Sequence, residues 1–138
     1  MTKVVARFLL DRSLGQRKLL ARLREAGWEA TTLADQFGDS RAQRMLDEEW
    51  IAEGTRLGFV LLAKDHRIAT VPLEASCIYL NDARVVTFAR GDLTAEQMGD
   101  ICLAHEKAIH RLATVQGPFV FSVSANGLRR KRLNWPPD

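Results

Sequence analysis

The chain lacks several features that mark common protein classes. It has only two cysteines, Cys77 and Cys102, whose spacing matches no metal site, so we expect two reduced, buried thiols and no disulfide scaffold. No apolar run approaches the roughly 20 residues that cross a bilayer. Residues 1–7 are too short and too interrupted to form a signal peptide. We therefore expect a cytoplasmic protein with no membrane association.

Several catalytic motifs are also missing. There is no glycine-rich phosphate loop and no serine in a nucleophile-elbow context. His105 and His110 are five residues apart, which is the wrong spacing for a shared metal on one helical face. These absences argue against a P-loop nucleotide hydrolase, a serine hydrolase and a histidine-ligated metal enzyme.

The composition is that of an ordinary globular domain with a mildly basic surface. The length of 138 residues suits one domain, with 46% hydrophobic and 27% charged residues. The net charge of +3 and the pI of about 9.2 favour a polyanionic partner. Much of the basic charge is clustered at Arg12, Arg17 and Lys18, at Lys64 and Arg67, and at residues 129–132.

Strand-like and helix-like segments alternate along the chain. Apolar runs predict strands at 4–10, 28–33, 59–63, 84–89 and 119–123, and apolar stripes predict helices at 14–26, 46–57 and 73–80. A capping box at Thr94 and Gln97 opens another helix that runs to about residue 114. Residues 34–45 are polar, with a turn expected at 37–40. This order predicts an α/β fold with a mostly parallel central sheet and helices on both faces.

Two of the predicted strands are directly followed by an acid. Asp11 follows the run FLL, and Asp65 lies two residues after the run FVLLA. Ligands of a parallel sheet bind beyond the carboxyl ends of its strands, and Asp47 and Glu48 open a predicted helix. Converging carboxylates stay ionised only beside a cation, and oxygen ligands favour Mg²⁺ or Mn²⁺. Taken singly, each acid is better explained as a turn former or helix cap, and only their joint placement favours a metal site.

Cations flank the same acids. If a metal binds there, we expect the neighbouring side chains to orient the phosphate backbone of a substrate. These predicted substrate-binding residues are Arg12, Lys64 and Arg67.

The segments FLLDRSLG, LREAGWEATTLADQFG and DEEWIAEGTRLGFVLLAKDHRI, in this order, resemble the PIN-like nucleases, specifically the toxin group related to VapC. The resemblance covers about residues 7–90, and GPFVFSV near the end also fits. It implies a metal-dependent endoribonuclease that acts as the toxin of a toxin–antitoxin pair. The implied catalytic acids are Asp11, Asp47 or Glu48, and Asp65, with Mg²⁺ or Mn²⁺ held by Asp11, Asp47 and Asp65.

The resemblance also implies partners and domain limits. It implies an RNA substrate, a protein antitoxin and a homodimer, with residues 1–127 as the PIN-like domain. Residues 128–138 are basic and then proline-rich, so we expect them to form a loosely held tail. PIN domains often have a hydroxyl residue two positions before the third acid, where this chain has Ala63. The candidates for a fourth acid are Glu74 and Asp82.

Two other functions compete with the nuclease. A catalytically degenerate PIN-like module would bind RNA or a protein through the basic tail, and the alanine at position 63 favours it. A receiver-type phosphoacceptor domain shares the sheet and an acid pocket, but it needs paired acids after the first strand. Here Arg12 follows Asp11, which argues against a receiver.

Overall fold

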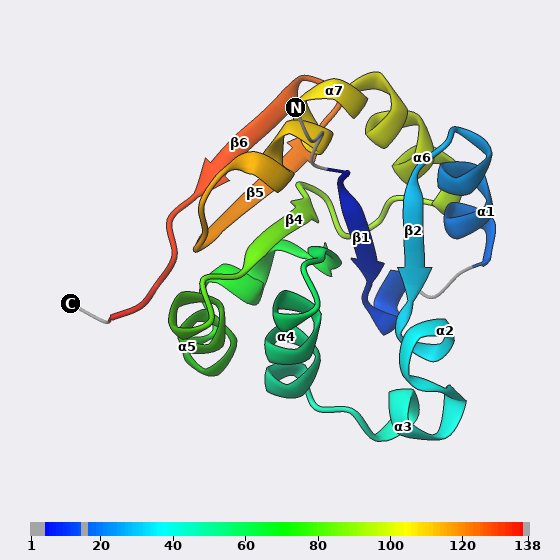
Figure 1. Ribbon diagram of the computed structural model, residues 1–138. Helices are drawn as coiled ribbons and strands as arrows, with labels where there is room; N and C mark the ends of the chain where they lie inside the picture. The colour runs from blue at the N-terminus through cyan, green and yellow to red at the C-terminus, as the bar shows by residue number, and fades with distance from the viewer. Residues whose placement is uncertain (1–4, 15–16, 137–138) are drawn as a thin grey trace.

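The computed structural model describes residues 5–14 and 17–136, in which one sheet lies between two layers of helices (Figure 1). Its strands are ordered β2-β1-β3-β4-β5-β6, of which the first five are parallel and β6 is antiparallel to β5. The predicted fold class is thereby confirmed. The strands are β1 (Arg7–Leu10), β2 (Glu29–Thr32), β3 (Val60–Asp65), β4 (Arg84–Phe88), β5 (Phe119–Ser124) and β6 (Gly127–Lys131).

The helices connect and cover these strands. Some predicted positions lie outside the described residues: residue 4 of the first strand, residues 15 and 16 of the first helix, and residues 137 and 138 of the tail. The α-helices are α1 (Arg17–Glu25), α2 (Leu33–Phe37), α3 (Asp39–Arg44), α4 (Asp47–Arg56), α5 (Pro72–Leu80), α6 (Ala95–Ala104) and α7 (Glu106–Arg111). The 3-10 helices are η1 (Arg12–Leu14), η2 (His66–Ala69) and η3 (Leu112–Thr114).

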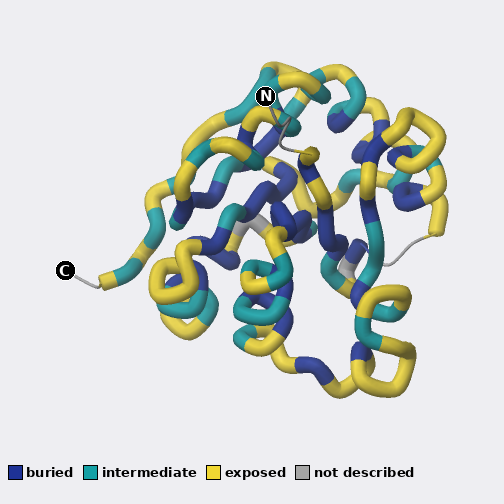
Figure 2. Tube along the Cα trace, in the orientation of Figure 1, coloured by how far each residue is buried: buried dark blue, intermediate teal, exposed yellow. Residues whose placement is uncertain are grey.

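The sheet buries apolar side chains on both faces, and the buried residues follow its central strands (Figure 2). Phe8 and Leu10 of β1 pack with α1, α6 and α7, whereas Leu9 between them packs with α4 and α5 on the other face. This explains why β1 and β3 are continuous apolar runs rather than alternating ones. Since β1 and β3 are neighbours and parallel, the residues that follow them lie at one edge of the sheet.

Residues 34–45, expected to be a polar stretch with a turn, fold into the short helices α2 and α3. Thr32 caps α2 by accepting a hydrogen bond from the Asp35 backbone N–H at 3.1 Å. Gly38 separates the two helices at φ 90°, a conformation that favours glycine, so the predicted turn is present. Each helix is too short to show a helical period in the sequence, which is why they were not predicted.

The helix predicted up to residue 114 is divided. Its capping box is confirmed, since Thr94 accepts from the Gln97 N–H and the Gln97 side chain accepts from the Thr94 N–H. The helix ends at His105, whose φ of −118° is not helical, and α7 and η3 follow. Met98 and Cys102 of α6 and Ile109 of α7 are buried against the same face of the sheet, so the predicted apolar stripe serves as core.

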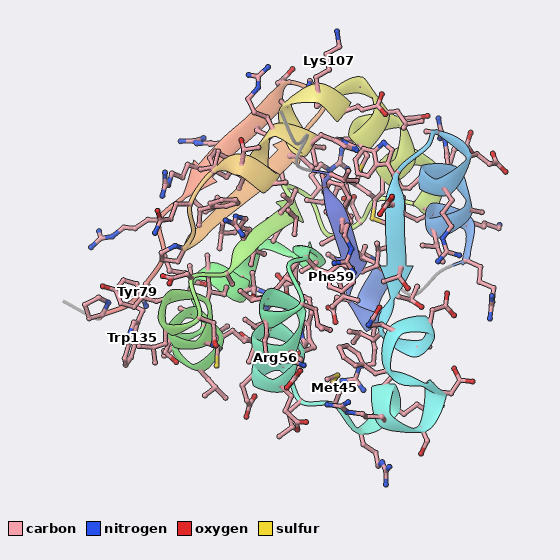
Figure 3. All side chains as sticks on the ribbon, viewed as in Figure 1. Met45, Arg56, Phe59, Tyr79, Lys107 and Trp135 are labelled. Atoms are coloured by element: carbon pink, nitrogen blue, oxygen red, sulfur yellow. The ribbon has the colours of Figure 1, made fainter. Side chains whose placement is uncertain are left out.

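The expectation of a loosely held tail after residue 127 is wrong for residues 128–131. They belong to β6, in which Leu128 pairs with Val123 and Arg130 with Phe121. The turn before β6 ends at Gly127 with φ 126°. Beyond the strand, the Asn134 N–H donates to the Ala69 carbonyl at 2.9 Å, so the chain returns to the end of η2, just before α5. Trp135, the next residue, is labelled in Figure 3.

Both cysteines are free thiols, as expected; Cys102 is buried and Cys77 is half-buried. Among the described residues, no helix combines the length and the apolar character needed to cross a membrane.

Candidate functional site

A cavity of about 430 Å³ opens beyond the carboxyl ends of β1 and β3, beside α4 and α5. We call it the acid cavity, because carboxylates from β3, α4, α5 and the connection after β1 line it. The lining residues are Asp11, Asp47, Trp50, Ala63, Asp65, Arg67, Ile68, Val71 and Glu74.

The two acids predicted at strand ends are held by the sheet and by local backbone bonds. The Asp11 N–H donates to the Leu62 carbonyl at 2.9 Å, which extends the contact between β1 and β3 by one residue. The Asp11 Oδ1 accepts from the Arg12 N–H at 2.7 Å, and the Asp65 Oδ1 accepts from the Arg67 N–H at 2.9 Å. Asp65 caps η2 through this bond, and the Asp11 carbonyl accepts from the Leu14 N–H at 2.9 Å in a turn. Both acids therefore have the local role that the sequence offered as the alternative to metal binding.

The helix acid that reaches the cavity is Asp47, the first residue of α4. Its Oδ1 accepts a hydrogen bond of 3.3 Å from Nε1 of Trp50, whose side chain is almost completely buried. Glu48 does not line the cavity. It lies on the side of Cys77 in α5, where burial first and then the Glu48 charge raise the pKa of that thiol. The structure thus brings Asp47, and not Glu48, to the other acids.

Of the two candidates for a fourth acid, Glu74 lines this cavity and Asp82 does not. It lies in the first turn of α5, two residues after Pro72 at the helix start. Burial, a hydrogen bond to Asp47 and the charges of Asp47, Asp65 and Asp11 together raise the pKa of Glu74 from 4.5 to about 7, and burial makes the largest contribution. Asp82 is instead in the turn after α5, at φ 54°. The sequence did contain a signal for the position of Glu74, because Pro72 marks the start of a helix and Glu74 then falls in its first turn.

Arg67 is the predicted cation that enters the cavity. Its Nε donates to Asp65 Oδ1 at 3.1 Å and its Nη2 donates to Asp65 Oδ2 at 2.7 Å, which is a bidentate ion pair. Arg12 lies outside the acid cavity, and its Nη1 donates to the Gln43 carbonyl at 2.8 Å. Lys64 is half-buried and does not line the cavity. Only one of the three predicted phosphate-binding side chains is therefore placed among the acids.

The donor set fits a hard divalent cation in its chemistry. Four carboxylates on one cavity provide the oxygen ligands that Mg²⁺ and Mn²⁺ prefer. The raised pKa of Glu74 shows that these acids are close enough to affect one another. Within the described part of the chain, however, no three Asp, Glu, His or Cys side chains are gathered tightly enough to hold an ion. Arg67 holds both oxygens of Asp65, so a metal ion would compete with this arginine.

Comparison with known proteins identifies the family. Residues 6–90, more than half of the chain, match the family described as a PIN like domain. The protein named "Putative ribonuclease VapC45" of Mycobacterium tuberculosis (strain H37Rv) is 33% identical over 121 residues, which are 88% of this chain and 88% of that protein. No solved structure matches the chain. With four acids at the carboxyl edge of a mostly parallel sheet, and with these two matches, the chain belongs to the PIN-like domain family and is related to the VapC group.

Proposed function

We propose that the chain is a metal-dependent endoribonuclease and the toxin of a type II toxin–antitoxin pair. The observation that carries this proposal is the acid cavity, which is lined by four carboxylates from distant parts of the sequence: Asp11, Asp47, Asp65 and Glu74. Family membership supports it, as does the name of the mycobacterial relative, which describes that protein as a ribonuclease.

In this proposal Asp11, Asp47 and Asp65 hold Mg²⁺ or Mn²⁺, with Glu74 beside them. Held by these carboxylates at the carboxyl edge of the sheet, Mg²⁺ or Mn²⁺ would supply a water of lowered pKa and positive charge opposite the scissile phosphodiester. Hydrolysis consumes one water and breaks one P–O bond of the RNA backbone.

The cations have unequal roles in binding the substrate. Arg67 lies inside the cavity and is mostly exposed, so its guanidinium can contact a phosphate when it leaves Asp65. Arg12 lies directly after Asp11 and provides positive charge at the edge of the cavity. Lys64 is next to Asp65 in sequence but outside the cavity, and we assign it at most a long-range attraction for RNA.

The partners follow from the proposed class. A protein antitoxin would cover the acid cavity and prevent access of RNA, and its natural contacts are the four carboxylates. The homodimer and the cytoplasmic location expected from the sequence remain predictions.

The test is RNA cleavage by the purified protein with Mn²⁺ or Mg²⁺. We expect cleavage by the natural chain and none by Asp11→Asn or Asp65→Asn, since each change removes a negative charge from the cavity. Circular dichroism controls for folding. Cleavage by both variants at the natural rate would contradict the assignment of the acids. Growth arrest on expression, relieved by the same two changes, would distinguish a toxin from another RNase.

The second candidate is a catalytically degenerate PIN-like module that binds RNA or a protein. Two observations favour it: the ion pair between Arg67 and Asp65, and Ala63, which lines the cavity but provides no hydroxyl. Calorimetric titration with Mn²⁺ separates the two candidates. The nuclease requires binding that Asp65→Asn weakens, whereas the degenerate module predicts no heat from this site.

A further inference from the structure

A second pocket, of about 240 Å³, lies on the other side of Asp11 from the acid cavity. We call it the side pocket. It is formed where β1 and β2 end, between α1 and the short helices α2 and α3. Its lining residues are Leu10, Asp11, Arg12, Arg17, Leu20, Thr32, Leu33, Ala34, Asp35, Asp39, Ala42 and Gln43.

The side pocket has an apolar floor and a polar rim. The floor is made of buried side chains, which are Leu10, Leu20, Leu33 and Ala42. The rim carries the charged and amide side chains of η1, α1, α2 and α3. A flat ring with polar edges matches such a surface, because its faces contact the apolar floor while its edges form hydrogen bonds at the rim.

Hydrogen bonds fix the walls of this pocket. Arg12 of η1 donates to the Gln43 carbonyl of α3 at 2.8 Å, which joins the two sides of the opening. Asp35 is held near Arg24, with 3.5 Å between Nη2 and Oδ2. In the chain as described, no hydrogen bond or ion pair engages the carboxylate of Asp39 or the side-chain amide of Gln43. These two groups are thus available to a ligand.

The charge of the pocket distinguishes between parts of a nucleotide. The pocket is lined by three carboxylates, those of Asp11, Asp35 and Asp39, and by only two guanidinium groups, those of Arg12 and Arg17. A phosphate dianion would be repelled by this excess of negative charge. A neutral base that presents N–H groups would instead find acceptors, and a carboxylate accepts two N–H groups at once from the Watson–Crick edge of guanine.

We propose that the side pocket binds an unpaired nucleobase of the RNA strand, adjacent to the phosphate at the acid cavity, and prefers guanine. Asp11 lines both spaces, so a strand whose phosphate lies at the acids has its neighbouring base beside α2 and α3. Asp39 accepts from the base edge, Gln43 contributes the second polar contact, and Leu33 contacts the base face. The inference rests on the proposed ribonuclease activity for its choice of ligand.

The first test maps cleavage in a pool of RNAs with randomised sequence. The natural chain should enrich guanine about five- to tenfold at one position beside the cut, as expected for one bidentate contact to a base edge. Asp39→Asn removes an acceptor, and Ala34→Leu fills the pocket; both should abolish the enrichment while cleavage continues. Gln36→Leu is the matched control, because Gln36 is exposed on the same helix and does not line the pocket. Cleavage without base preference, or a preference unchanged in both pocket variants, would overturn the proposal.

A second test does not depend on cleavage. Guanosine, which has no phosphate, should shift the methyl resonances of Leu20 and Leu33 when it is added to the metal-free protein, and adenosine should shift them less. Asp39→Asn should remove the difference between the two nucleosides. Absence of shifts at millimolar nucleoside would refute the base site even if RNA is cleaved. If the resonances shift but the protein cleaves no RNA, the base site is supported and the proposed nuclease activity is refuted.

Discussion

The acid cavity and the side pocket share Asp11 but differ in charge and in the elements that form them. The acid cavity is lined by four carboxylates and one guanidinium group. It is formed at the ends of β1, β3, α4 and α5, which contribute to the core of the domain. The side pocket has an apolar floor, nearly balanced charge and walls from two helices of five and six residues. The proposed cation site thus rests on core strands and on helices of ten and nine residues, whereas the proposed base site rests on much shorter helices. Substitutions in α2 and α3 can therefore alter base preference without disturbing the acids.

The largest expected effect concerns which acid belongs to the cavity. We expect Asp47→Asn to reduce RNA cleavage more than about 100-fold, because loss of residues that merely support a metal ligand already costs about 10- to 100-fold. Glu48→Gln, which removes the same charge one residue later but outside the cavity, should change cleavage less than about twofold. Single-turnover cleavage rates measure both. Equal losses in the two variants would show that only the charge of the helix start matters.

A smaller effect is expected from the cation inside the acid cavity. Arg67→Ala removes the guanidinium that competes for Asp65, so the metal-free protein should bind Mn²⁺ about two- to fivefold more tightly, in the range of exposed ion pairs. RNA affinity should fall at the same time, since a phosphate contact is lost. Calorimetry and RNA titration measure the two effects. Lys64→Ala is the control. An equal gain in Mn²⁺ affinity in that variant would show that the Arg67 effect comes from the change in net charge and not from its ion pair with Asp65.

The smallest effect is a change in the pH dependence of stability. The pKa of Glu74 is about 7 in the folded protein, above its ordinary value of 4.5. Between these values the folded metal-free chain keeps a proton that the unfolded chain releases, so Glu74 makes the free energy of unfolding fall as pH rises from 4.5 to 7. Glu74→Gln stays neutral and should lack this decline. Urea unfolding in EDTA at pH 5 and pH 7.5 measures it, and parallel profiles of the two proteins would contradict the raised pKa.

Much of the fold was predictable because buried strands and helices have recognisable patterns of apolar residues in the sequence. The runs before Asp11 and Asp65 are continuous and apolar, which indicated parallel strands covered on both faces. The capping box of Thr94 and Gln97 located a helix start within one residue. Strand β6 was missed because its basic residues resemble a solvated tail, and its pairing with β5 depends on a turn and on contacts such as that of Arg130 with the Phe121 ring.

The sequence by itself determined that Asp11 and Asp65 stand at one edge of the sheet, because parallel strands end on the same side. Tertiary structure alone decided the other members of the acid cavity. Burial of Trp50 sets the rotation of α4, and this turns Asp47 toward the cavity and Glu48 toward α5. Packing of α5 against α4 brings in Glu74 and leaves Asp82 in a turn. The direction of a side chain on a helix depends on which face the rest of the molecule buries, and a single stretch of sequence does not contain that information.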